Sequence, residues 1–144
     1  MIEQDTIKLL RECDAGIQMG VSAIDQVLDH AQSESLRRSL TDSKAEHDRL
    51  KEELQTALER FGDEGKNPNP MAKTMSTVKT NMEMMMKPTD ATIADLITDG
   101  CNMGVKSLSK YLNQYAAADE SAKDVCKKLI AMEEQLAKDL RGYL

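Results

Sequence analysis

One six-residue pattern occurs twice in this chain, first as GIQMGV from Gly16 to Val21 and again as GCNMGV from Gly100 to Val105. The two copies lie 84 residues apart, and each sits in a long stretch with apolar residues at three- and four-residue steps. Such steps are typical of amphipathic helices. The repeat therefore predicts a duplicated helical hairpin, and two helical hairpins pack most simply as an all-α four-helix bundle.

The composition agrees with a bundle and argues against several other classes. The chain has 144 residues, no Trp and one Phe, so its core must be built from Leu, Ile, Val, Ala and Met. Its net charge of −6 argues against a general nucleic-acid surface. No apolar run approaches the roughly 20 residues that span a bilayer, and we expect no membrane contact and a cytoplasmic location. Three cysteines without a Cys-x-x-Cys spacing predict reduced thiols rather than disulfides or a zinc site.

We expect a single domain over 1–144, with one hairpin at about 5–62, a crossover at about 63–88 and a second hairpin at about 89–144. Helix caps are predicted at Asp5 or Thr6, at Ser33 and at Thr89 or Asp90, and Gly62 is expected to end the second helix in a left-handed conformation. The fourth helix should follow a loop at 116–119. The predicted core stripe of the first helix is Ile7, Leu10, Cys13, Ile17, Gly20, Ile24 and Leu28, and that of the second is Leu36, Leu40, Ser43, His47, Leu50, Leu54, Ala57 and Phe61.

The crossover follows from the symmetry of the repeat. Two copies of a hairpin related by a two-fold axis perpendicular to the bundle would place the first and third helices antiparallel. The second helix would then be parallel to the third, and the chain between them must travel the full length of the bundle. The segment from Met71 to Met86 carries methionines on one helical face until Pro88, and we expect an extra amphipathic helix there.

The glycines of the repeat need a physical reason, because a Gly inside a helix costs about 0.5 to 1 kcal/mol relative to Ala. We expect Gly16, Gly20, Gly100 and Gly104 to lie where the first and third helices cross with their backbones close together.

These elements together resemble an uncharacterised ferritin-like four-helix-bundle family of bacteria. The resemblance rests on Asp14 to Gly20, on Asp99 beside Gly100, and on the two hairpins that surround them. It implies the ferritin-like fold and a history as a metal-binding scaffold. Di-metal bundles use inward Glu residues and Glu-x-x-His motifs, whereas this chain has Gln18 and Asn102 in the corresponding places and no Glu-x-x-His. Oxidase or iron-storage activity is therefore not implied.

Two groups of side chains remain as candidate metal ligands. His47 and Glu133 occupy equivalent core positions on the second and fourth helices, and we expect them to meet. They would form either part of a metal site, supported by Asp14 or Gln18, or a buried hydrogen bond that also involves a group such as Ser43. Met82, Met85 and Met86 resemble thioether clusters that bind Cu(I), although adjacent methionines on a helix point in different directions and suit packing equally well.

The sequence favours a non-enzymatic bundle with a structural or partner-binding role, no cofactor and a lost di-metal site. The alternative is a metal-binding protein that uses His47 and Glu133 or the Met-rich segment. Met19 and Met103 lie off the core stripes, so a homodimer or an unidentified protein partner stays open as a way to cover them. Cys126 lies near Lys127 and Lys128, which would lower the pKa of an exposed thiol.

Overall fold

The computed structural model describes residues 2–66, 84 and 87–144, and all of their regular structure is helical. The first hairpin consists of α1 (Ile2–Leu28) and α2 (Glu34–Glu59). The second consists of α4 (Asp90–Gln114) and α5 (Glu120–Leu140), followed by the short 3₁₀ helix η1 (Arg141–Tyr143). The prediction of an all-α four-helix bundle is confirmed.

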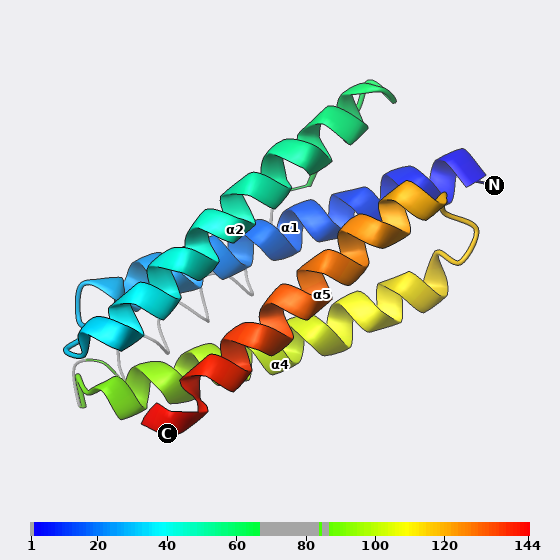
Figure 1. The fold of residues 1–144 in the computed structure, drawn as a ribbon. Coiled ribbons are helices and arrows are strands. Elements are labelled where there is room, and N and C mark those ends of the chain that lie inside the picture. The colour runs from blue at the N-terminus through cyan, green and yellow to red at the C-terminus, as the bar shows by residue number, and fades with distance from the viewer. Residues whose placement is uncertain (1, 67–83, 85–86) are drawn as a thin grey trace.

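The helices run in the directions that the repeat predicts (Figure 1). The helices α1 and α4 are antiparallel, whereas α2 and α4 are parallel and start at the same end of the bundle. The chain must therefore cross the length of the bundle between Lys66 and Asp90. Most of this crossover, including the expected Met-rich helix at 71–86, lies outside the described residues; Met84 is described and is buried in the core.

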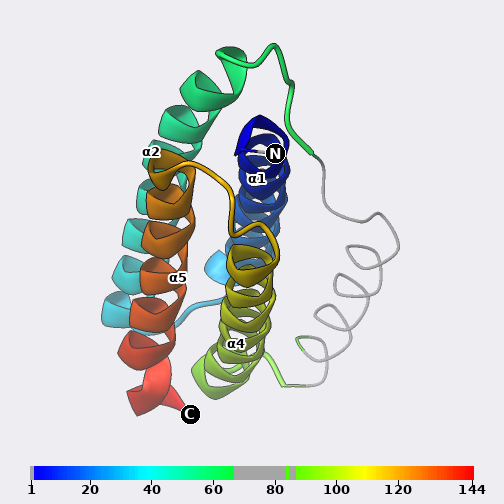
Figure 2. The ribbon, with the colours of Figure 1, turned by 90° about the vertical axis from the view of Figure 1, so that its right-hand side faces the viewer.

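The four helices form two layers. Viewed along the bundle, α1 and α4 make one layer, and α2 and α5 make the other (Figure 2). The helix α1 also contacts α5 across the diagonal, so it packs against all three other helices. This explains why Leu9, Asp14 and Val27 are buried as well as the predicted stripe residues Leu10, Cys13, Ile17 and Ile24. The predicted single stripe of core residues on α1 was therefore too narrow, because α1 contacts three helices.

The helix starts agree with the sequence for α2 and α4 but not for α1. The hydroxyl of Ser33 accepts from the backbone NH of Leu36 at 3.5 Å, and the hydroxyl of Thr89 accepts from that of Thr92 at 3.2 Å. The helix α1 instead begins at Ile2, before the expected caps Asp5 and Thr6. Those two side chains are used elsewhere: they accept from backbone NH groups of the loop between α4 and α5.

The ends of the bundle are held by reciprocal contacts. At one end Asp5 accepts from the NH of Ala117 at 3.2 Å, and Thr6 accepts from the NH of Asp119 at 2.9 Å. At the other end the Asp90 carboxylate accepts from the NH groups of Gln32 and Ser33 at 2.8 and 3.0 Å. The start of α1 thus binds the loop between α4 and α5, and the start of α4 binds the loop between α1 and α2.

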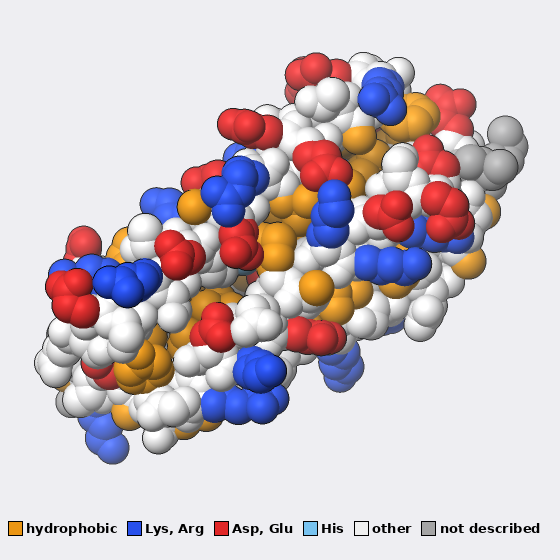
Figure 3. Space-filling model, in the orientation of Figure 1, with side chains coloured by type: hydrophobic (Ala, Val, Ile, Leu, Met, Phe, Trp, Pro, Cys, Tyr) orange, Lys and Arg blue, Asp and Glu red, His pale blue; other side chains and the backbone are white. Residues whose placement is uncertain are grey.

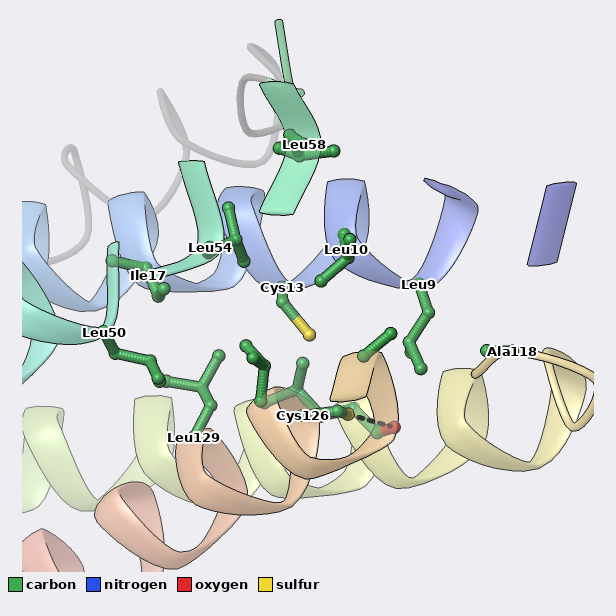
Figure 4. Packing of buried hydrophobic residues seen from close by; sticks show 13 residues of the cluster. Leu9, Leu10, Cys13, Ile17, Leu50, Leu54, Leu58, Ala118, Cys126 and Leu129 are labelled. Carbon is green, nitrogen blue, oxygen red and sulfur yellow. Dashed lines mark hydrogen bonds between the residues drawn. The ribbon is translucent and has the colours of Figure 1, made fainter. Parts of the chain in front are cut away.

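The apolar core consists of two clusters along the bundle axis. The first contains Leu10, Ile17, Leu54 and Leu129, and Figure 4 shows Cys13 of α1 directed toward α5 within it. The second contains Ile24, Leu40, Ile97, Leu136 and Leu140 among others. Each helix therefore has a short interval between its two sets of core residues. These intervals contain Gly20 on α1, Ser43 and His47 on α2, Gly104 on α4 and Glu133 on α5.

Charges on the visible face are mixed. In Figure 3, acidic and basic side chains alternate over the surface of α2 and α5, with apolar side chains visible between the two helices. One contact between these helices joins Lys128 to Glu53 at 3.1 Å, where both side chains are about half exposed. Such surface pairs contribute only about 0.2 to 1 kcal/mol, so packing dominates the stability of this bundle. None of the helices in the described ranges is long and apolar enough to cross a membrane.

Candidate functional site

The two candidate residues His47 and Glu133 meet in the centre of the bundle. The Nε2 atom of His47 lies 2.9 Å from Oε1 of Glu133, across the contact between α2 and α5. The imidazole has no exposed surface, and Glu133 is only 7% exposed. The equivalent positions of these residues on the second and fourth helices were sufficient to predict this contact.

The second nitrogen of His47 fixes its protonation. Nδ1 lies 2.7 Å from the backbone carbonyl oxygen of Ser43. A carbonyl oxygen can only accept, so Nδ1 must carry a proton. The remaining proton is then shared along the contact between Nε2 and Glu133: either the imidazole is a cation beside a carboxylate, or a neutral imidazole accepts from a protonated Glu133.

The surroundings favour the ion pair. Burial alone would lower the pKa of His47, but the hydrogen bonds with Glu133 and with the Ser43 carbonyl outweigh it, and the pKa is raised above its ordinary value. Both hydrogen bonds stabilise the protonated form of His47 against the cost of its burial. The pair is neutral as a unit, which makes its burial tolerable.

Cys101 on α4 borders the same carboxylate. Burial and the neighbouring Glu133 raise the pKa of this thiol well above its ordinary value, so it stays protonated. Spacing places Cys101 on the same face of α4 as Gly104, three residues along, but it does not indicate that this face meets Glu133.

The glycines of the repeat frame this polar layer. A Cβ atom on Gly20 would lie 2.8 Å from Nε2 of His47 and 3.4 Å from Oε1 of Glu133. A Cβ atom on Gly104 would lie 3.7 Å from Oε2 of Glu133. Gly20 and Gly104 thus stand over Glu133 from α1 and α4 respectively, and Gly20 leaves the space that the imidazole occupies.

The Cβ positions add a reason for Gly20 and Gly104 that the sequence did not indicate. The nearest neighbours of Gly20 and Gly104 are side chains of the polar layer, not the backbone of the opposite helix. A Cβ on Gly16 would meet only the side chains of Leu129 and Leu108, and among the described residues nothing lies within 4 Å of a Cβ on Gly100. The predicted crossing of α1 and α4 at the four glycines stays a prediction.

Asp14 and Gln18 do not join the polar layer. The Asp14 carboxylate accepts from the side chain of Gln18 at 3.2 Å and from the backbone NH of Lys66 at 3.0 Å. Its close contact with Gly65, whose φ is +91°, leaves no room for a side chain there. Asp14 therefore anchors the segment that follows α2, and the expected support of a metal by these residues is wrong.

The remaining candidates are either inaccessible or outside the described residues. Cys126 is fully buried, so the expectation for an exposed thiol beside Lys127 and Lys128 does not apply, and its thiol donates to the backbone carbonyl of Leu108 at 3.6 Å. The hydrogen bond between Cys13 and Cys126 lowers the pKa of Cys126, and together with burial it raises the pKa of Cys13. Met82, Met85 and Met86 lie outside the described residues. Within the part of the chain that the structure describes, no three His, Cys, Asp or Glu residues are grouped so that they could hold a metal ion.

A groove leads from the surface to this layer. It has a volume of about 460 Å³ and lies between α1 and α4, with Met19 and Met103 in its walls and His47 and Glu133 among its lining residues. Met103 is 71% exposed. No protein-family model, curated protein or solved structure matches this chain.

Proposed function

We propose that this chain is a non-enzymatic, cytoplasmic bundle of the ferritin-like type that has lost its di-metal site and has a structural or partner-binding role. The observation that carries the proposal is the engagement of both ring nitrogens of His47. Nδ1 is bound to the Ser43 carbonyl at 2.7 Å, and Nε2 to Glu133 at 2.9 Å. A metal-binding His needs one nitrogen free for the ion, so metal binding here would break a buried hydrogen bond.

Elemental analysis tests this proposal. The protein should be purified without chelator, and its iron, manganese and zinc contents should be measured beside those of a His47→Leu variant. We expect less than one-tenth of an equivalent of metal in both. A stoichiometric metal that disappears in His47→Leu would contradict the proposal and establish a metal site at the polar layer.

A second candidate function is metal binding, and the meeting of His47 with Glu133 at 2.9 Å supports it. Imidazole and carboxylate are both ligand types for transition metals. The methionines of the Met-rich segment would offer a separate site for a soft metal ion such as Cu(I). Titration with Cu(I) of the wild type and of a variant with Met82, Met85 and Met86 changed to Leu distinguishes this site, because equal weak binding by both proteins excludes it.

A further inference from the structure

Cys13 of α1 and Cys126 of α5 lie opposite each other, because these two helices run in the same direction and in a fixed register (Figure 1). Near the start of both helices, the hydroxyl of Thr6 accepts from the backbone NH of Asp119 at 2.9 Å. Cys13 follows Thr6 by seven residues, and Cys126 follows Asp119 by seven residues. Seven residues make about two helical turns, so both cysteines lie on the faces that carry this contact, about 10.5 Å further along the bundle.

The same register continues beyond the two cysteines. Gly20 follows Cys13 by seven residues, and Glu133 follows Cys126 by seven residues. A Cβ atom on Gly20 would lie 3.4 Å from Oε1 of Glu133. Contacts between α1 and α5 therefore fix the alignment of the two helices on both sides of the cysteine pair.

The two thiols are in direct contact within the apolar core. Both side chains have no exposed surface and belong to one apolar cluster. Figure 4 shows the sulfur of Cys13 directed toward α5, where Cys126 lies. The Cys13 thiol is hydrogen-bonded to Cys126, whose own thiol donates to the backbone carbonyl of Leu108 at 3.6 Å. No side chain separates the two sulfur atoms, so none has to be displaced when they approach to the length of a disulfide, about 2.05 Å.

We propose that Cys13 and Cys126 form a disulfide when the protein reacts with a hydroperoxide, and that this bond joins the first helical hairpin to the second. A disulfide is neutral and has no N–H or O–H group that would need a partner, so it suits the apolar core in which the thiols lie. In the cytoplasm, the location proposed above, disulfides are usually transient and redox-sensing. The bond should therefore be reversible by thiol reductants.

The sulfur that reacts first is that of Cys126. The hydrogen bond between the thiols lowers the pKa of Cys126 and raises that of Cys13. The Cys126 thiolate attacks one oxygen of hydrogen peroxide and becomes a sulfenic acid; the O–O bond breaks, and the second oxygen takes up the proton that Cys126 lost and leaves as water. The Cys13 sulfur then attacks the sulfenic sulfur, the S–O bond breaks, and the hydroxide leaves as water with the Cys13 proton. The two thiols lose two electrons, and hydrogen peroxide gains them.

Peroxide can reach the pair only when this end of the bundle opens, because neither sulfur is exposed. The end is closed by hydrogen bonds from the NH groups of Ala117 and Asp119 to the side chains of Asp5 and Thr6, at 3.2 and 2.9 Å. Once the bundle has closed again, a disulfide would hold α1 to α5. Oxidation should therefore be promoted by local opening and should then stabilise the bundle against further opening.

The first test follows the reaction of the reduced full chain with hydrogen peroxide, in buffer and in urea below the unfolding transition. Free thiols are counted after denaturation, and linked peptides are identified by mass spectrometry. We expect the three free thiols to fall to one, faster in urea, with Cys13 joined to Cys126. The urea midpoint of the oxidised protein should rise by about 1 M or more, and dithiothreitol should reverse the rise.

The third cysteine provides a matched control. Cys101 lies on α4 beside Glu133, away from the other two thiols. Cys101→Ala should form the same disulfide and retain no free thiol. Cys13→Ala and Cys126→Ala should form no intramolecular disulfide, and peroxide should not raise their urea midpoints. Circular dichroism before oxidation shows which variants are folded, and either of the last two is sufficient for the comparison.

Three results would overturn the inference. Three free thiols that persist at every urea concentration below the transition would show that the folded protein does not form the bond. A cross-link through Cys101, or between two copies of the chain, would place the reactive thiol elsewhere. Sulfinic acid at Cys126 beside a free Cys13 thiol would show that the two sulfurs do not meet during oxidation.

Discussion

At the scale of single residues, Gly20 is a position where the fold tolerates little change. Its absent side chain leaves the space of an imidazole that is fully buried and held at both nitrogens. The ring therefore cannot move aside at low cost. A Cβ atom on Gly104, the equivalent of Gly20 in the other repeat copy, would lie 3.7 Å from Oε2 of Glu133, and Gly100, the equivalent of Gly16, has open space around it among the described residues. Identical residues in the two copies thus meet different surroundings.

We expect Gly20→Ala and Gly100→Ala to change stability in opposite directions. Gly20→Ala should lower the free energy of unfolding by about 1 to 3 kcal/mol, because the new methyl group overpacks the site of His47. Gly100→Ala should raise it by up to about 1 kcal/mol through helix propensity. Urea denaturation of both variants measures the difference. Similar effects of the two substitutions would contradict the role assigned to Gly20.

His47 also predicts how stability depends on pH. Its pKa in the folded protein is raised above the unfolded value of about 6.5. Its contribution to stability is therefore fully present below about pH 6.5 and is lost as the pH rises through the folded pKa. We expect the free energy of unfolding of the wild type, relative to a variant with His47→Leu and Glu133→Leu, to fall as the pH rises above about 6.5. The slope should not exceed about 1.4 kcal/mol per pH unit.

The reference variant removes both members of the pair, so groups elsewhere in the chain titrate alike in the two proteins and cancel. Urea midpoints and slopes at half-unit intervals of pH are sufficient for the comparison. A stability difference that stays constant, or that grows with pH, would mean that His47 is neutral in the folded protein.

At the scale of helices and loops, the sequence predicted what depends on local periodicity and missed what depends on contacts between elements. The seam of α2 as far as Leu54 and the caps at Ser33 and Thr89 follow from spacing and side-chain chemistry, whereas beyond Leu54 it is Leu58 that is buried and not the predicted Ala57 and Phe61. The start of α1 did not, because Asp5 and Thr6 look like caps but bind a loop more than 100 residues away. No local pattern distinguishes a side chain that caps its own helix from one that binds another element.

The candidate site likewise contains one contact that the sequence predicts and others that depend on how the helices pack. The meeting of His47 with Glu133 could be predicted, because the matching core spacing of α2 and α5 places both residues in one layer. The proximity of Cys101 to Glu133 and the position of Gly104 over Oε2 could not, since they depend on the rotation of α4 about its axis. Spacing predicts which residues share a face of a helix, but not which atoms of a neighbouring helix that face meets.

At the scale of the whole molecule, the polar layer divides the core into two apolar clusters. Four helices pack without interruption above and below it, so the bundle does not depend on the layer for its architecture. A buried ion pair often contributes less to stability than apolar residues of similar size, although removal of one partner alone is costly. A double-mutant cycle on His47 and Glu133 separates these two effects.

We expect His47→Leu and Glu133→Leu to lower the free energy of unfolding by about 3 to 5 kcal/mol each, because each leaves one buried polar group without its partner. The double variant should be as stable as the wild type, or more stable by up to about 4 kcal/mol. Glu134→Leu, on the exposed face of α5, serves as the control and should change stability by no more than about 0.5 kcal/mol. Urea denaturation at pH 6 provides all four values.

A double variant that is less stable than either single variant would show that the fold requires the layer. The expected result has a different consequence. If the core packs equally well without His47 and Glu133, folding stability does not explain their presence, and it does not explain why helix-weakening glycines stand over them on both α1 and α4. The reason for the layer would then lie in the groove that His47, Glu133, Gly20 and Gly104 line rather than in stability.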